Sequence, residues 1–364
     1  MTDRPARRTL HVVVPGSLDT PTGGYRYDRR IVRGLRAAGR RTLVHELDGA
    51  FPNPSPGDLE AADEALGALA DGALACVDGL AFGAMPEIAE RHAARLDLVA
   101  LVHHPLMHET GLSDEAVERH RRDETRALAA ARRVIVTSAT TRDGLAELDV
   151  DPDRVTVVAP GTDEAPVATG STDGVPELLC VATLTLRKDH ATLVEALARV
   201  AHRPWRLTCI GSDEADPATA AALRERVRAL GLEDRVRLVG ALDEDELAAR
   251  RAGSDLFVLA SRYEGHGMVF DEAIASALPI VATVGGAIAD TVPAEAALLV
   301  PAGDIDALAG ALDTALGDAA TLERLRAGAL AARARQRRWD VALAEFDAAL
   351  EPDLAGLDRT GDSR

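Results

Sequence analysis

The sequence predicts an α/β protein built from two Rossmann-like, doubly wound domains. Short β-branched runs alternate with Ala-, Leu- and Arg-rich segments of helical period along the whole chain, which is the pattern of βαβ units and parallel sheets. The chain has 364 residues, and because domains commonly hold about 100–200 residues, two of them are expected. The stretch 162–176, rich in Gly, Pro, Thr and Asp and without periodicity, separates two alternating halves.

Six strands are expected in the first half, each a short apolar run bounded by polar or small residues. They are Leu10–Val14, Thr42–Leu47, Ala73–Val77, Leu98–His103, Val134–Thr137 and Val155–Ala159. Helical periodicity between them is clearest at Tyr25–Ala38 and Asp114–Ala131.

The second half repeats the alternation. Strands are expected at Leu178–Ala182, Arg206–Ile210, Val236–Val239, Leu256–Leu259, Ile280–Thr283 and Ala297–Val300. Helices are expected at about His190–Val200, Ala218–Leu230, Glu244–Arg251 and Gly267–Ala277. After Pro301 the pattern is helical to about Leu350. In open parallel sheets ligands bind at the carboxyl ends of the strands, so these loops are where function is sought.

Composition limits the function classes. The net charge of −18 argues against a nucleic-acid partner, which needs a basic surface. Cys76, Cys180 and Cys209 are odd in number and widely spaced, which favours buried free thiols over a disulfide framework or a metal cluster. The N-terminal residues lack a signal-peptide core, and no apolar run approaches the ~20 residues that span a bilayer. A cytoplasmic protein is therefore expected.

The most specific segment is 260–286, ASRYEGHGMVFDEAIASALPIVATVGG. Glu264 lies in a Gly-rich loop after a buried strand, and Glu272 follows eight positions later in the next helix. The amides of Gly267, Met268 and Val269 would open that helix, and a helix N-terminus attracts anions. A carboxylate at Glu272 could accept both hydroxyls of a ribose.

This segment resembles the GT-B glycosyltransferases of family 4, whose hallmark is a Glu-x7-Glu pair in the same strand–loop–helix setting. The resemblance extends over nearly the whole chain in the same order: TGGYRYDRRIVRGLRAAG at 22–39, LVHHP at 101–105, VTVVAPGTD at 155–163, VATLTLRKDHATLVEALARV at 181–200 and WDVALAEFDAAL at 339–350.

The resemblance implies a GT-B fold, in which two Rossmann-like domains face each other across a cleft. The implied parts are an N-terminal acceptor-binding domain at 1–165, a linker at 166–176 and a donor-binding domain at 177–335. A C-terminal helix at 336–352 then crosses back to the first domain, and a flexible tail occupies 353–364.

The resemblance also implies roles for particular residues. Lys188 contacts the donor diphosphate and stabilises the leaving nucleoside diphosphate, with Arg187 as a second cation. Of the 41 basic residues, Lys188 is the single lysine, and a compact ammonium meets a diphosphate differently from a planar guanidinium. Glu264 faces the transferred sugar, Glu272 holds the ribose, and the amides after Gly267 meet the distal phosphate. Gly240 lines the base pocket, and Gly24 of the Gly-Gly loop is a further donor contact.

Several positions depart from the family pattern. Ala182-Thr183 stands where many members have Gly-Arg, so a common cation is absent and Arg187 is the candidate substitute. His266 replaces an aromatic residue, Ala277 replaces a glycine and Asp290 replaces a frequent glutamate. The Glu pair is intact, and these changes leave the donor's identity open.

Acceptor residues are sought at the strand ends of the first domain. His103 and His104 end one strand, and because neighbouring strand residues point to opposite sides, at most one faces the ligand side. His104 is the favoured catalytic candidate and His103 an acceptor contact, with a structural histidine as the alternative. Asp78 after another strand and Tyr25 in the Gly-Gly loop are further acceptor candidates. An Asp-Gly turn is the alternative reading of Asp78.

The resemblance implies a retaining hexosyltransferase, which moves a sugar from a UDP- or GDP-sugar to an acceptor hydroxyl. No cofactor and no metal are expected, because Lys188, Arg187 and a helix N-terminus supply positive charge. The Asp-x-Asp strings that begin at Asp149, Asp151, Asp243 and Asp304 are interpreted as turns and helix N-caps.

The helical segment 26–41 carries seven Arg and one Asp. It predicts either peripheral contact with an anionic membrane at its inner face, with a lipid-linked acceptor, or an ordinary solvated surface. The same sequence is also compatible with a small-molecule acceptor or a sugar acceptor.

Two other functions remain as alternatives. A non-catalytic sugar-nucleotide-binding partner subunit would fit the missing Gly-Arg, although the Glu pair and Lys188 argue against it. A sugar-nucleotide epimerase-like enzyme would share the architecture, but the Glu-x7-Glu loop argues against that function. A dinucleotide-dependent dehydrogenase is disfavoured because no strand is followed by G-x-G-x-x-G. The donor sugar, the acceptor and the oligomeric state are not readable from the sequence.

Overall fold

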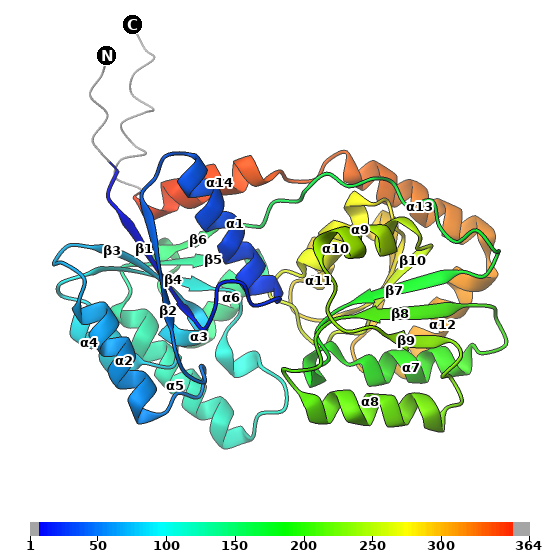
Figure 1. The fold of residues 1–364 in the computed structure, drawn as a ribbon, viewed down its shortest axis with the longest axis horizontal. Coiled ribbons are helices and arrows are strands. Elements are labelled where there is room, and N and C mark those ends of the chain that lie inside the picture. The colour runs from blue at the N-terminus through cyan, green and yellow to red at the C-terminus, as the bar shows by residue number, and fades with distance from the viewer. Residues whose placement is uncertain (1–6, 352–364) are drawn as a thin grey trace, which may run out of the picture. The chain divides into compact units, whose positions relative to one another are not determined.

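The structure is a computed structural model that describes residues 7–351. The chain divides into two compact units (Figure 1). Within the described residues, the first unit comprises residues 7–161 and 338–351, and the second is Thr162–Arg337. Each unit has its own parallel sheet and its own apolar core.

The first unit contains a six-stranded parallel sheet in the order β2-β1-β3-β4-β5-β6. Its strands are β1 Leu10–Pro15, β2 Thr42–Leu47, β3 Leu74–Asp78, β4 Asp97–Val102, β5 Arg133–Val136 and β6 Val155–Val157. The helices include α1 Gly23–Ala37, α2 Pro56–Gly67, α3 Gly79–Phe82, α4 Pro86–His92, α5 Asp114–Ala130, α6 Ala139–Gly144 and the C-terminal α14 Trp339–Leu350. The strand order reverses between β1 and β3, which is where such sheets bind ligands.

The second unit contains another six-stranded parallel sheet, in the order β12-β11-β10-β7-β8-β9. Its strands are β7 Glu177–Val181, β8 Arg206–Ile210, β9 Val236–Leu238, β10 Leu256–Leu259, β11 Ile280–Val284 and β12 Ala297–Pro301. Its helices include α7 His190–Arg199, α8 Pro217–Ala229, α9 Glu244–Ala252, α10 Met268–Ala275, α11 Ile288–Thr291, α12 Ile305–Gly317 and α13 Ala319–Arg333. Here the order reverses between β7 and β10.

All twelve strands expected from the sequence are present, with ends shifted by one or two residues at most. The apolar runs identify the inner strands because these are buried between helices, whereas the edge strands β2, β6, β9 and β12 are only partly buried. Figure 1 shows α1 and α14 on one face of the first sheet and α2, α4 and α5 on the other.

The sequence analysis did not single out α2, although a local signal marks its start. The Ser55 hydroxyl accepts from the Asp58 amide, and the Asp58 carboxylate accepts in turn from the Ser55 amide. This capping box satisfies two amides that the helix leaves without intrahelical partners.

The irregular stretch at 162–176 contains no helix or long strand, as expected, but it is not a free connector. It runs against the second unit, where the Ala168 amide donates to the Ser276 carbonyl at 2.8 Å and the Thr169 amide donates to the Ala252 carbonyl at 2.8 Å. Ala168 is buried in the core of that unit. The stretch therefore behaves as part of the second unit.

The C-terminal helix α14 belongs to the first unit and packs on α1. Close packing is possible because Gly34 lies against Leu343. The buried Arg40 guanidinium pairs with Asp347 at 2.6 Å and with Glu351 at 2.5 Å. The predicted return of the terminal helix is therefore confirmed, while the predicted tail at 353–364 lies outside the described residues.

Candidate functional site

In the second unit, the carboxyl ends of β7 and β10 lie side by side at the point where the strand order reverses. The loop after β7 carries Arg187 and Lys188, and the loop after β10 carries Glu264. The Arg262 amide donates to the Arg187 carbonyl at 2.8 Å, which joins the two loops. Lys188 and Glu264, which are 76 positions apart in the chain, are thereby brought together.

Glu264 is the centre of this cluster. Its Oε1 accepts from Lys188 Nζ at 2.5 Å and from the Ser261 hydroxyl at 2.6 Å. Arg187 lies 3.6 Å from its other carboxylate oxygen and also donates to the Tyr263 carbonyl at 3.0 Å. Two cations therefore converge on a carboxylate that is only 5% exposed.

The charges in this cluster are strongly coupled. Burial opposes ionisation of Glu264, but Lys188 and Arg187 outweigh it and lower the pKa of this carboxyl. Burial also lowers the pKa of Lys188, against the attraction of Glu264. A buried cluster of two cations and one carboxylate is suited to receive a further anion, because charges interact more strongly away from water.

Two glycines make room for the Glu264 loop. The Glu264 amide donates to the Gly285 carbonyl at 3.2 Å, and the Ala287 amide donates to the Glu264 carbonyl at 2.8 Å. Gly286 has φ of 60°, and a side chain there would overlap the Glu264 carbonyl oxygen. Glycine is needed here both for the left-handed backbone and for the close approach.

Helix α10 begins directly after this loop. Gly267, at its N-cap, has φ of 87°, and the amides that follow, from Met268 and Val269, lie in the first turn. The first amides of any helix have no intrahelical acceptor, which makes this end a site for anions. Glu272, further along α10, receives Arg251 Nη1 from α9 at 2.7 Å.

Gly240 lies at the end of β9 with φ of 77°, and its carbonyl accepts from the Gly211 amide at 2.9 Å. Gly211 in turn is so close to the Ala182 carbonyl that no side chain would fit. This packing ties together the ends of β7, β8 and β9. It places Gly240 on the same sheet edge as the Lys188 loop.

In the first unit a second cluster forms around His103, at the end of β4. Its Nε2 lies 3.1 Å from Asp28 on α1 and 3.4 Å from Asp78 at the end of β3. The ring packs edge-on against Tyr27 and against the backbone of Gly24. The expected acceptor candidates Asp78 and His103 are thus brought together, next to the strand-order reversal.

Tyr25 lies near the same cluster, and its hydroxyl donates to the Pro15 carbonyl. Burial raises the pKa of Tyr25, and the charges of Asp78 and Asp28 add to the rise. His104 instead contacts Glu109 at 3.3 Å. The structure therefore groups His103, and not His104, with the other candidates, and the catalytic role of His104 stays a prediction.

Asp78 also combines the two readings that the sequence left open. Its Oδ1 accepts from the Leu80 amide at 2.8 Å and so caps α3, while its Oδ2 faces His103. The Asp78 carboxylate therefore both caps the turn and belongs to the His103 cluster.

The sequence analysis missed Asp28, Ser261 and Arg251. Asp28 is the single acid among the seven arginines of 26–41, which was a usable signal. Ser261 lies only three residues before Glu264 in the same loop, so its contact is local, but its residue type did not mark it. Arg251 gave no signal, because its contact with Glu272 depends on how α9 packs against α10.

The positions that depart from the family pattern have structural partners. His266 contacts Asp271 at 2.7 Å. Ala277, where glycine is usual, is buried with φ of 54°, a conformation that favours glycine. The Asp-x-Asp strings form caps, as expected: Asp151, Asp243 and Asp304 accept the amides of Asp153, Glu246 and Ala307.

We expect His103 to titrate far above the usual range for histidine. Burial disfavours the charged ring, but Asp28 and Asp78 outweigh it and raise the pKa of His103 to about 10. Because this pKa exceeds the unfolded value, the stabilisation is complete below pH ~6.5 and is lost as the pH rises toward ~10. NMR titration of the imidazole should show this, with a lower pKa in Asp28→Asn.

The control for that titration is Asp19→Asn, which removes an exposed carboxylate on the same unit. It should leave the His103 titration unchanged. A His103 pKa near 6.5 in the parent protein would contradict the ion-pair cluster.

Solved structures share this fold. Sucrose-phosphate synthase from Thermosynechococcus elongatus superposes with a TM-score of 0.80 over 96% of this chain and 100% of that one, at 23% identity. Anabaena HepE in complex with UDP and glucose superposes with a TM-score of 0.75 over 94% and 99%, at 18% identity. The two-sheet fold is that of the GT-B glycosyltransferases.

Sequence comparisons then give the family. The family "Glycosyl transferases group 1" matches residues 175–318, and "Glycosyltransferase Family 4" matches residues 76–165. D-inositol 3-phosphate glycosyltransferases of Jonesia denitrificans and Corynebacterium efficiens are 34% and 30% identical over 210 and 255 residues, which are 52% and 62% of this chain. The chain belongs to glycosyltransferase family 4. The two alignments span 49% and 60% of the relatives' lengths.

Proposed function

We propose that the protein is a retaining glycosyltransferase that moves a hexose from a nucleoside-diphosphate sugar to an acceptor hydroxyl without a metal ion. The observation that carries the proposal is the convergence of Lys188 and Arg187 on Glu264 at the β7/β10 reversal, directly before the N-terminus of α10. A diphosphate needs this combination of cations and helix amides.

In the proposed reaction, the bond between the anomeric carbon and the phosphate oxygen breaks and a bond to the acceptor oxygen forms on the same face. The acceptor's proton passes to the leaving phosphate. Lys188 and Arg187 stabilise the charge that develops on the diphosphate, and the amides of Gly267, Met268 and Val269 bind its distal phosphate. Glu264 faces the transferred sugar and keeps Lys188 in place.

The ribose contact is assigned to Glu272. Arg251 holds one of its oxygens at 2.7 Å, which fixes the carboxylate on α10. A carboxylate fixed by a second side chain loses little entropy when it binds a diol. Gly240, on the same sheet edge, is assigned to the base pocket.

We expect UDP- or GDP-sugars as donors. HepE was solved with UDP-glucose, and a relative from Mycobacterium tuberculosis is a GDP-mannose-dependent mannosyltransferase, 31% identical over half of this chain. The choice between these nucleotides and the sugar is left to experiment. In the first unit, Asp28, His103 and Asp78 are proposed to position the acceptor hydroxyl.

The test is release of nucleoside diphosphate from a panel of UDP-, GDP- and ADP-sugars, with and without EDTA. Slow hydrolysis of one donor that is unchanged by EDTA and lost in Glu272→Ala would support the proposal. A donor that binds by calorimetry but is never turned over, even with acceptors present, would favour the alternative of a non-catalytic partner subunit. Interconversion of the free donor's epimers would indicate the epimerase-like alternative.

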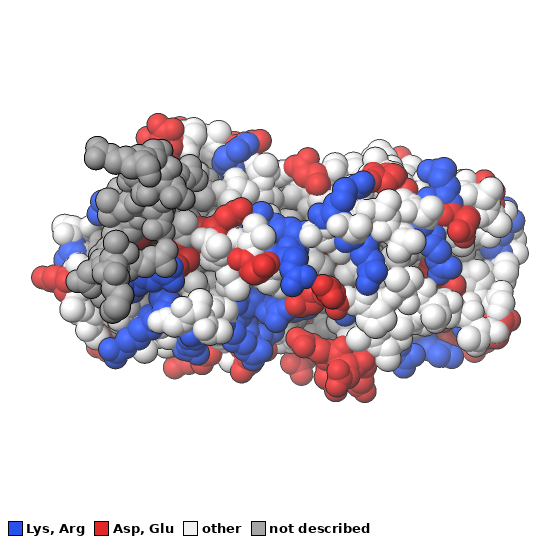
Figure 2. All heavy atoms as spheres, turned by 90° about the horizontal axis from the view of Figure 1, so that it is seen from above, with Lys and Arg blue, Asp and Glu red and all other residues white. Residues whose placement is uncertain are grey.

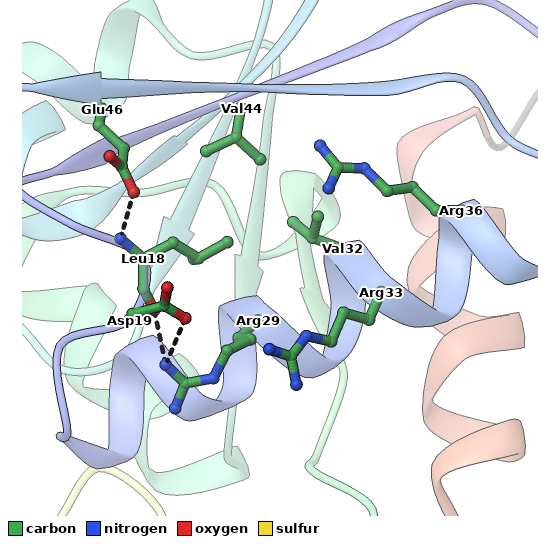
Figure 3. Close-up of a pocket in the computed structure, with 8 residues that line it drawn as sticks. All are labelled: Leu18, Asp19, Arg29, Val32, Arg33, Arg36, Val44 and Glu46. Atoms are coloured by element: carbon green, nitrogen blue, oxygen red, sulfur yellow. Dashed lines mark hydrogen bonds and ion pairs between the residues drawn. The ribbon is translucent and has the colours of Figure 1, made fainter.

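We also propose that helix α1 contacts an anionic surface, either a membrane or a lipid-linked acceptor. No helix within residues 7–351 is both long and apolar enough to cross a bilayer. Between α1 and β2 lies a pocket of about 380 Å³, lined by Leu18, Asp19, Arg29, Val32, Arg33, Arg36, Val44 and Glu46 (Figure 3).

The arginines of this pocket differ in their contacts. The Arg29 guanidinium donates to the Leu18 carbonyl at 2.8 Å, and Arg36 Nε donates to the Thr42 carbonyl at 3.0 Å. Arg33 and Arg36 are exposed residues beside Val32 and Val44 (Figure 3). The face seen in Figure 2 mixes basic and acidic side chains, so local positive groups exist despite the negative net charge. Cations beside aliphatic side chains suit a lipid–water interface.

Replacing Arg29, Arg33, Arg36 and Arg41 by Gln should abolish co-sedimentation with phosphatidylglycerol vesicles. Each basic residue near an anionic surface contributes about 1 kcal/mol, so four should lower binding by about a thousandfold. The matched control replaces the exposed Arg224, Arg226, Arg228 and Arg237 of the second unit and should retain binding. Absence of binding by the parent would end the membrane proposal.

A further inference from the structure

Two of the three cysteines meet a histidine in the core of the second unit. Cys180 on β7 and Cys209 on β8 are direct partners in the register of two adjacent parallel strands. His190 is the first residue of α7. Their exposed fractions are 0%, 1% and 3%, so all three are enclosed by protein.

The three side chains converge on one point. One ligand atom from each, the two Sγ atoms and a ring nitrogen, lies within 4.8 Å of the others. Ligands around a tetrahedral Zn²⁺, with bonds of about 2.0–2.3 Å, are separated by about 3.5 Å. The three atoms therefore lie within about 1.3 Å of the spacing that such an ion requires.

The imidazole of His190 is the second observation that points to a ligand. Both of its ring nitrogens are buried, and neither makes a hydrogen bond of normal geometry to any residue in the described range 7–351. A buried polar group without a partner is costly and uncommon. A neutral imidazole with a nitrogen directed at two sulfurs is what a thiophilic metal ion requires.

We propose that Cys180, Cys209 and His190 form a binding site for one thiophilic d¹⁰ cation, Zn²⁺ or Cu⁺. Binding forms two metal–sulfur bonds and one metal–nitrogen bond and releases the two thiol protons to solvent, with no change of oxidation state. With Zn²⁺ the site is electrically neutral, which suits a dry core.

The cation would fasten the loop that carries Lys188. Its ligands come from β7, β8 and the start of α7, and the loop from Ala182 to Asp189 runs between two of them. A structural metal site stabilises the segments that it joins. The proposal stands apart from the glycosyltransferase proposal, because its three ligands are buried in the core of the second unit and it is tested by metal binding alone.

The experiment titrates the reduced, metal-free full-length protein with Co²⁺, Zn²⁺ and, without oxygen, Cu⁺. Co²⁺ should give intense sulfur-to-cobalt charge-transfer bands that saturate at one ion per chain and disappear when Zn²⁺ is added. Displacement by Cu⁺ that Zn²⁺ cannot reverse would assign Cu⁺ as the preferred ion. Either ion should raise the Tm, whereas Mg²⁺ should not.

Cys209→Ser and His190→Ala should each weaken Zn²⁺ affinity at least about 100-fold, measured against a competing chelator. The matched control is Cys76→Ser, which removes the buried thiol of the first unit and should leave the affinity unchanged. If a variant fails to fold, metal binding by the parent protein still decides the test. No charge-transfer band and no bound Zn²⁺ or Cu⁺ in the parent would overturn the proposal.

Discussion

Lys188→Ala is expected to lower kcat for donor turnover by about 10²–10³. Removing one preorganised group that stabilises developing charge has an effect of that size. Lys188 is 14% exposed at its side chain and lies 2.5 Å from Glu264, so the cluster holds its ammonium before any donor arrives. Its loss would also leave Glu264 with Arg187 at 3.6 Å as its nearest cation partner.

The measurement is single-turnover release of nucleoside diphosphate, which separates chemistry from product release. Lys188→Arg should recover part of the rate, because the charge is kept but the planar guanidinium does not fit the place of an ammonium. Arg228→Ala removes an exposed cation on α8 and should have no effect. An unchanged kcat in Lys188→Ala would contradict the role proposed for this lysine.

Arg40→Ala is expected to destabilise the docking of α14 by about 3 kcal/mol, because truncating one partner of a buried ion pair leaves the other charge uncompensated. The Arg40 side chain is 1% exposed and its two partners, Asp347 and Glu351, lie in α14 and just after it. Arg7 and Arg8 also reach these carboxylates and would offset part of the loss.

Hydrogen exchange of the α14 amides is the direct measurement, since it reports local opening. A change of ~3 kcal/mol should speed exchange by about 150-fold. The neighbouring Arg41 is exposed, and Arg41→Ala should change exchange little. Equal protection in Arg40→Ala and Arg41→Ala would show that the buried pair does not hold the helix.

The seven arginines of 26–41 have different environments in the structure, which their composition alone does not reveal. In the sequence all seven are equivalent, and they predict a single basic surface. In the structure Arg40 is buried against Asp347 and Glu351, and Arg30 stacks on Trp339 of α14. These two serve the packing of α14, so the surface proposed to meet anions is smaller than the count suggests.

Local patterns determined the strands, the principal helices and the family of this protein. A buried parallel strand must be an apolar run, and the segment from Glu264 to Glu272 keeps its spacing because one loop and one helix turn span it. The caps at Asp151, Asp243 and Asp304 were likewise readable, because a cap acts on amides two or three residues away.

Tertiary packing decided which distant side chains meet. Strand order placed the Lys188 loop against the Glu264 loop, and His103 against Asp28 and Asp78. It also set Cys180 opposite Cys209 and beside His190. The wide spacing of the cysteines in the sequence had instead favoured buried free thiols. Hydrogen bonds and ion pairs act over a few ångströms, and only the folded sheets bring groups tens of residues apart within that distance.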